Sequence, residues 1–482
     1  MAAKDKVLKS LQQVLLVRDS TGTFGSTTIG TAAAKAQNTV VVPSTTNFAV
    51  GDTVRVGSGE SLELAVVATV NAGVSLVMAD PLTYDHAIGE PVVEQTAYDV
   101  GDIAEGGVTV NANAQTTDVG VATKRLAYTN LAGYTDLTAG FALPTITMQN
   151  LAIALGIDFT KITGAGTAAS PFALATDGTE ISGVQNASLI AIGVAMDGTV
   201  LRVELWGIDV DYTGLSLSLS RGNLATVPVK VMGAGGVATT NASAYVANTS
   251  IRPTKGKVFS ELSEVGLFVD ATVSPAATTL SAGFAAGSVN LTVASATGFS
   301  AGDWVRIGSG DTVEFHRIDT PFTIKTPLYR AQANGTVVVK QTLVPFAAPS
   351  SDGVTLAIGG NVDTIRAGNR RMSLGYKPGS AITTLSLAVI DFLLANFARA
   401  LGIPQAKIVS GRLPLTGDVI ATDIVQGAYV KGLLQSGETQ WINVWGCSQD
   451  VANFSTTLTN SGTPSLPIAF KPTSGIQFQQ HA

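Results

Sequence analysis

The chain has 482 residues, of which 45% are hydrophobic and only 13% are charged, with a formal net charge of −6. An ordinary soluble domain carries about 25% charged residues, so this composition argues against a charge-coated enzyme and favours a surface covered by other copies of the chain. Its single cysteine, Cys447, excludes an internal disulfide, and three histidines are too few for a zinc cage. We therefore expect no metal and no cofactor. We also expect no membrane span and no secretory signal, because no uncharged apolar stretch is long enough.

Closely spaced short strands are predicted between residues 38 and 96. They are Thr39–Val42, Thr53–Gly57, Leu62–Val70, Val74–Met78 and Pro91–Glu94, separated by turn residues. Strands of this length and spacing are typical of a small antiparallel barrel. The pair Gly51-Asp52 favours a turn rather than a ligand site, because glycine reaches positive φ and aspartate hydrogen-bonds the turn backbone. The sequence therefore predicts a small β-barrel inserted into a larger unit.

One helix and two strands are predicted after this insertion. Residues Ile146–Leu155 are apolar at helical spacing, and Gly156 follows as an expected helix end. Residues Glu204–Tyr212 have the pattern of a strand. In Leu215–Ser220 leucine and serine alternate strictly, as in a half-buried strand.

From residue 257 the sequence repeats itself. Matching blocks occur in the same order: Phe48–Glu60 recurs as Phe299–Asp311, Ala154–Ile157 as Ala400–Ile403, and Trp206-Gly207 as Trp445-Gly446. A tandem duplication predicts two units of one fold. The expected divisions are unit 1 at 1–37 and 97–232, its inserted barrel at 38–96, a linker at 233–256, unit 2 at 257–288 and 343–472, its inserted barrel at 289–342, and a C-terminal tail at 473–482.

The second copy is expected to repeat each element. Its barrel strands run from Val289–Val293 to Val337–Val339, and its helix from about Thr384 to Leu401, with Gly402 as the C-cap. The alternating strand recurs at Phe454–Thr459, which keeps the ends of that pattern. The predicted fold class is therefore mainly β, with two tandem units that each carry one flanking α-helix and one inserted β-barrel.

Residues with catalytic potential are few. The glycine-rich segments Gly164–Gly166 and Gly233–Gly236 lack the lysine that completes a phosphate loop. Asp209 and Asp211 are expected on one strand face, and no neighbour in sequence separates their pKa values, so a solvated polar face is favoured over general acid–base chemistry. Cys447 lies in a predicted strand and is expected to be a small buried hydrophobe. The sequence predicts no catalytic residue.

Basic residues gather most densely at Arg366, Arg370 and Arg371. These arginines could contact phosphate. The first half of the chain is net acidic and the second half net basic, so contact with the acidic half of a neighbouring copy is the favoured interpretation.

The strand-rich units, the helix ending in Ala-Leu-Gly-Ile in both copies, and the Trp-Gly pair before an alternating strand resemble the tail tube proteins (major tail proteins) of long-tailed bacteriophages. The segment Phe299–Gly308 resembles small β-domains that decorate phage structural proteins. The resemblance implies that each unit has a β-sandwich or partial-barrel fold. It also implies that the protein belongs to the virion, in the phage tail, and that the tail is assembled in the host cytoplasm. Its rings would stack into a hollow tube that delivers genomic DNA.

The duplication adds an expectation about stoichiometry. Single-unit members of this family form six-fold rings, so a fused pair implies a trimeric ring with pseudo-six-fold symmetry. The implied partners are other copies of the chain and the tape-measure, tail-terminator and baseplate proteins. Two alternatives stay open: another virion component of the baseplate or capsid surface, and a bacterial surface protein exported without a classical signal.

The lumen of such a tube should not grip DNA, whose phosphates bind basic side chains. We therefore expect an acidic or neutral lumen, with Asp209, Asp211 and Asp450 as candidate lining residues. The inserted barrels are expected to project outward, because inside they would block the bore.

Overall fold

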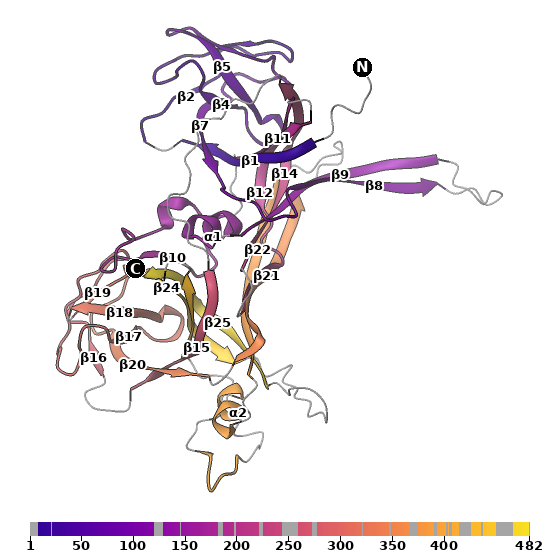
Figure 1. Ribbon diagram of the computed structural model, residues 1–482. Helices are drawn as coiled ribbons and strands as arrows, with labels where there is room; N and C mark the ends of the chain where they lie inside the picture. The colour runs from indigo at the N-terminus through magenta and orange to yellow at the C-terminus, as the bar shows by residue number, and fades with distance from the viewer. Residues whose placement is uncertain are drawn as a thin grey trace.

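The computed structural model describes residues 8–481 except 21, 120–128, 145, 182–186, 197–198, 221–224, 243–258, 272–276, 321, 347–348, 366–374, 390–392, 402, 404–406, 414–425, 435–436 and 450–465. Over these residues the protein is mainly β, as predicted. It contains two large antiparallel sheets of 12 and 13 strands and the helices α1 (Met148–Leu155) and α2 (Leu394–Ala400). Figure 1 shows the first inserted module, with β2, β4 and β5, at the top of the molecule and the second, with β16 to β19, at the lower left.

The first sheet has the strand order β3-β6-β5-β4-β7-β1-β11-β12-β14-β9-β8, and β2 pairs with β7. Its strands are β1 (Leu8–Asp19), β2 (Ser26–Thr28), β3 (Thr39–Val41), β4 (Thr53–Val56), β5 (Glu63–Asn71), β6 (Ser75–Met78), β7 (Pro91–Asp99), β8 (Thr109–Val119), β9 (Thr129–Leu143), β11 (Ala187–Ala195), β12 (Val200–Val210) and β14 (Val227–Ala242).

The second sheet has the order β13-β21-β22-β25-β24-β23-β15-β20-β17-β18-β19, with β10 on β25 and β16 on β20. Its strands are β10 (Phe172–Thr176), β13 (Leu215–Leu219), β15 (Phe259–Asp270), β16 (Ala277–Thr279), β17 (Trp304–Ile307), β18 (Glu314–Thr320), β19 (Thr323–Ile324), β20 (Val337–Pro345), β21 (Pro349–Ile365), β22 (Gly375–Val389), β23 (Gln426–Leu434), β24 (Thr439–Gln449) and β25 (Leu466–His481).

The two sheets repeat one topology. The run β1-β11-β12-β14-β9-β8 in the first corresponds to β15-β23-β24-β25-β22-β21 in the second, and β7-β4-β5 corresponds to β20-β17-β18. Each matched strand comes from the corresponding place in the other half of the chain. The topology is therefore that of a tandem duplication, and positions in the two halves can be compared directly.

Each inserted module has a hydrophobic core separate from the shared core of the two units. The first module's core includes Val40, Val54 and Leu76, and the second module's includes Val305 and Ile307. The first module contains all five predicted strands, within a few residues at their ends. In the second module the expected strand at 289–293 forms only isolated bridges, between Asn290 and Thr323 and between Val293 and Leu280.

Two predicted connecting segments are in fact strands. The expected linker begins at residue 233, but β14 continues to Ala242, and the expected tail from 473 to 482 is the second half of β25. Glycine in these segments marks close packing rather than flexibility. A Cβ on Gly233 would lie 2.5 Å from Leu205 Cδ1, so only glycine lets this part of β14 approach β12 closely.

The helix predictions are correct for the first copy and wrong in extent for the second. Helix α1 begins after Thr147, whose side chain accepts a hydrogen bond from the Asn150 N–H, and ends at Gly156 with φ 64°. In the second copy residues 384–389 belong to β22 and the helix begins only at Leu394. Leu385 and Val389 have the four-residue spacing of a helix face, but with Leu387 they also alternate as in a strand, and pairing with β21 and β25 selects the strand. Gly402, the predicted C-cap, and the alternating strand predicted at Phe454–Thr459 lie outside the described residues.

Candidate functional site

The two candidate lumen carboxylates of β12 and the turn after it are buried. Asp209 is 7% exposed and Asp211 is 6% exposed. Asp211 accepts a hydrogen bond from the Thr213 N–H at 3.0 Å and forms an ion pair with Lys230 Nζ of β14. These contacts fasten the turn after β12 to its neighbour. The predicted solvated face and the lumen-lining role do not fit this burial, because both require carboxylates that face water.

The other predicted charged sites cannot be placed. Asp450 and the arginines 366, 370 and 371 lie outside the described residues.

Each inserted module contains a buried carboxylate bonded to a histidine. Glu63 Oε1 lies 2.8 Å from His86 Nε2, and Glu314 Oε2 lies 2.9 Å from His316 Nε2. Glu63 and Glu314 are matching positions, each the first residue of its strand, and each also accepts two backbone N–H bonds from a nearby loop. These carboxylates therefore brace loops of the modules. Among the described residues no group of three His, Cys, Asp or Glu side chains could hold a metal ion.

A cysteine thiol and a polar cleft could also carry chemistry. The thiol of Cys447 is buried in the core, and the cleft is bridged by contacts between the units. Burial raises the pKa of Cys447 to about 12, which keeps its thiol protonated and unreactive. A cleft of about 390 Å³ separates a first-half loop from the second module, but its polar side chains bond one another across it. Tyr329 donates to Glu180 at 2.5 Å, and Arg330 pairs with Asp177 at 2.9 Å. Polar side chains of the two halves of the chain thus contact each other across this cleft.

The most informative feature of the molecule is that two strands of the first half complete the sheet of the second half. Strand β10 pairs with the end of β25, and β13 pairs with β21. In β13 the three leucines are buried and the two serines are exposed, as the alternation predicts. Leu217 lies opposite Leu356, and Leu215 lies opposite Ile358. The first copy's alternating strand therefore belongs structurally to the second copy.

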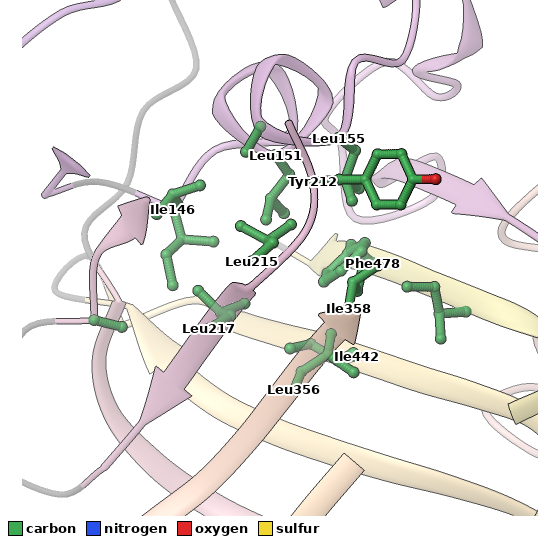
Figure 2. Packing of buried hydrophobic residues seen from close by; sticks show 14 of the residues in the cluster. Ile146, Leu151, Leu155, Tyr212, Leu215, Leu217, Leu356, Ile358, Ile442 and Phe478 are labelled. Carbon is green, nitrogen blue, oxygen red and sulfur yellow. The ribbon is translucent and has the colours of Figure 1, made fainter. Parts of the chain in front are cut away.

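A shared hydrophobic core joins these elements. Figure 2 shows Leu151 and Leu155 of α1 beside Leu215 of β13, with Ile358 and Phe478 of the second sheet around them. Helix α1 also packs against β10 and β14. The helix, β10 and β13 thus form one set of docking elements, through which the first unit is fixed to the second.

The corresponding edge of the first sheet is open in the described part of the chain. There β8 pairs only with β9, whereas its counterpart β21 is covered by β13. Val110 of β8 is 38% exposed, while the matching Leu356 of β21 is 2% exposed. Ala112 is also exposed, while the matching Ile358 is buried. The core-facing side of β8 is therefore apolar and uncovered.

A second open edge lies on β14. Residues 237–241 pair with β12 on one side, and no described residue pairs with their other side. The matching part of β25 is covered by β10. Val237 and Thr239 are exposed, whereas the matching Ile476 and Phe478 are buried. We refer to residues 108–112, which include the start of β8, and residues 237–241 of β14 as the open edges.

Helix α2, the counterpart of α1 in the second unit, carries exposed apolar side chains as well. Leu394 of α2 is 37% exposed, but the matching Met148 of α1, which lies between the units, is 4% exposed. Val409, which follows α2, is exposed too. Figure 1 shows α2 at the end of the molecule opposite β8 and the first module. The described part of the chain thus presents the open edges on the first unit and an exposed helix α2 on the second.

Comparison with protein-family models and with curated proteins finds no match to this chain. Among the described helices, none is long and apolar enough to cross a membrane.

Sequence reasoning did not find the open edges, although a signal is present. Residues Val108 to Asn113 alternate apolar and polar side chains, as a half-buried strand requires. What the alternation cannot show is that the apolar face has no cover within the described chain.

Proposed function

We propose that this protein is a structural virion subunit that assembles into stacked rings and forms the hollow tail tube of a long-tailed bacteriophage. Three chains form each ring, because each chain supplies two equivalent units and six units close the ring. Genomic DNA passes through the lumen.

One observation carries this proposal: the first unit joins the second by adding its strands to the edges of the second sheet. The same contact is available again, since helix α2 of the second unit is exposed and the first unit has open edges. A head-to-tail contact of this kind repeats, and it gives a closed ring when the rotation between units divides a full turn. A duplicated chain that already contains one such contact is a fragment of that ring.

The surface chemistry supports assembly over catalysis. Only 13% of residues are charged, and apolar side chains are exposed on both units, Val110 and Val237 on the first and Leu394 and Val409 on the second. The buried carboxylates and the cysteine described above are engaged in packing and bracing. The partners that we propose are therefore, first, other copies of the chain. The tape-measure protein inside the tube and the tail-terminator and baseplate proteins at its ends are the others.

The inserted modules fit the exterior of such a tube. Each has its own core, and in Figure 1 the first module lies at the top of the molecule while the second lies beside β15 and β24. We assign no lumen residue to β12, because Asp209 and Asp211 are buried.

Negative-stain electron microscopy of the purified protein tests the proposal. We expect rings or hollow filaments with six similar lobes around the bore. A monodisperse monomer without rings would contradict it. A small closed oligomer that never stacks would favour a baseplate or capsid component, and location on a bacterial cell surface would favour the exported surface protein.

A further inference from the structure

We propose that helix α2 of one copy packs against the open edges of the first unit in the next copy. The inference rests on the proposed self-assembly and specifies its contact. The docking surface, which we call the α2 patch, consists of Leu393 and Leu394 at the start of α2 and of Val409 after it. The receiving surface includes Val110 and Val237 of the open edges, so the occupant is a second copy of this chain.

The template for this contact lies between the two units of one chain. Helix α1 packs on β14 and β12 of its own unit and also reaches the second unit, where Leu151 and Leu155 lie near Phe478 (Figure 2). A cavity of about 200 Å³ beside its first turn is lined by Met148 of α1 and by Gln480 of β25, among others. Met148 is buried there. The first turn of α1 is therefore enclosed between the units, whereas the matching Leu394 of α2 is exposed.

The residues around α2 form a small core that stands apart. Ala398, Leu401 and Ile403 are buried together, and this cluster is separate from the shared core. Ile408 and Leu413 pack against it. In the first unit the matching residues all belong to, or pack against, the shared core: Ala152, Leu155, Ile157, Ile162 and Leu174. The same set of apolar residues thus joins a neighbouring unit in the first copy and stays a separate cluster in the second.

The position of Val409 follows from the repeat as well. Val409 forms an isolated β-bridge that matches the bridge of Thr163 in the first unit. Thr163 and Gln477 of β25 line the same cleft between the two units. Val409 itself is 63% exposed. Transferred to the second contact, it lies at the counterpart of Gln477 in the next copy, which is Ala238 in the open edge of β14.

Exposed apolar residues gather on the two surfaces of this contact. Outside the inserted modules, the large hydrophobic residues that are exposed in the described part of the chain are Val110, Met196, Val237, Leu393, Leu394 and Val409. All of them except Met196 belong to the α2 patch or to the open edges. Scattered apolar residues are ordinary on a surface, but residues gathered at two matching places indicate an interface. Covering one surface with the other removes both from water.

The geometry assigns this contact to two copies rather than one. Figure 1 shows α2 at the bottom of the molecule, away from β8 and from the first module at the top. Helix α2 therefore meets the open edges of another chain. Each such contact continues the order of first and second units from one chain to the next, as in a head-to-tail assembly.

Two complementary variants of the full-length chain test the contact. Leu394→Glu places a carboxylate in the α2 patch, and because it lies in the first turn of the helix it is compatible with the helix dipole. Val237→Glu places a carboxylate in the open edge of β14. Each variant alone should need at least about tenfold more protein to assemble, because an unpaired carboxylate is costly to bury. Sedimentation velocity measures the mass of the species formed.

The decisive sample is an equimolar mixture of the two variants. The intact α2 of the Val237→Glu chain meets the intact edge of the Leu394→Glu chain, so the mixture should form a complex of two chains and stop there. If α2 bound α2 and edge bound edge, each variant alone would instead form dimers through its intact surface. Such dimers, a mixture that stays monomeric, or either variant assembling like the unmodified protein would each overturn the proposal.

A matched control places the same charge elsewhere. Ile88 is an exposed residue of the first module, so Ile88→Glu should assemble like the unmodified protein. Leu394 and Val237 are exposed too, and circular dichroism of the single variants should match that of the unmodified chain. Loss of assembly by Ile88→Glu to the same extent would show a general effect of charge and overturn the assignment.

Microscopy of the same samples separates this inference from the proposed function. Rings formed as readily by Leu394→Glu or Val237→Glu as by the unmodified protein would overturn the α2 contact and leave the tube standing. A two-chain complex from the mixture, with no rings from the unmodified protein, would uphold the contact and refute the tube. An unmodified chain that stays monomeric at every concentration would overturn both.

Discussion

A substitution in the first half of the chain should destabilise the second half. Leu217 of β13 is buried among residues of the second sheet, opposite Leu356. Replacing it by alanine removes most of a side chain that packs between the two units. The account therefore predicts that Leu217→Ala weakens a sheet to which the first half contributes only two short strands.

The expected size of the effect follows from burial. Truncating a buried leucine to alanine costs about 2–5 kcal/mol, depending on how far the site collapses. Leu217 is the central one of three buried leucines in β13, with paired neighbours on both sides, so little collapse is expected and the cost should be in the upper half of this range.

Tryptophan fluorescence during urea unfolding monitors the stability of the second unit. Of the four tryptophans, Trp304, Trp441 and Trp445 are buried together in the second unit, so its unfolding dominates the signal. Leu217→Ala should lower the midpoint of this transition. Ser218→Ala, on the exposed face of the same strand, should change the free energy of unfolding by less than about 0.5 kcal/mol.

A second control separates coupling from general damage. Leu76→Ala removes a buried leucine from the core of the first module, which makes no part of the second sheet. It should leave the tryptophan transition of the second unit nearly unchanged. If Leu217→Ala behaved like Ser218→Ala, or if Leu76→Ala lowered the second unit's stability as much as Leu217→Ala, the strand contribution of β13 would be refuted.

Two more predictions concern buried titratable groups. Burial lowers the pKa of His86, but hydrogen bonds to Glu63 and Glu90 outweigh it, so the folded-state pKa is raised above the usual value near 6.5. The stabilisation from protonated His86 is thus full below about pH 6.5 and is lost as pH rises through the folded-state pKa; His86→Gln, which copies Gln332 at the matching position, should flatten this dependence in thermal melts of the protein. Cys447 should not react with a thiol reagent at pH 8 in the native protein and should react fully after unfolding, so rapid native reaction would contradict its burial.

The repeated fold was predictable from the sequence because duplication leaves matched residues in matched order. The strands of the first module and β13 were predictable because each has a short, regular alternation of apolar residues bounded by turns. These signals are local, and they describe each copy by itself.

The errors arose where tertiary packing decides between two local readings. Leu385 and Val389 suit either a helix face or one face of a strand, and pairing on both sides of β22 selects the strand. Gly233 looked like part of a linker, yet it allows β14 to pass close to Leu205.

The open edges could not have been predicted from the sequence alone. Alternation shows that β8 has an apolar face, but only the comparison of Val110 with Leu356 shows that one copy is covered and the other is not. The addition of β10 and β13 of the first unit to the second sheet is likewise a property of the assembled fold.

The most direct test of the account is the mass of a single isolated ring, measured by native mass spectrometry. The account predicts three chains in each ring, since each contributes two equivalent units to six positions. A ring of six chains, or a protein that stays a single chain at every concentration, would contradict it.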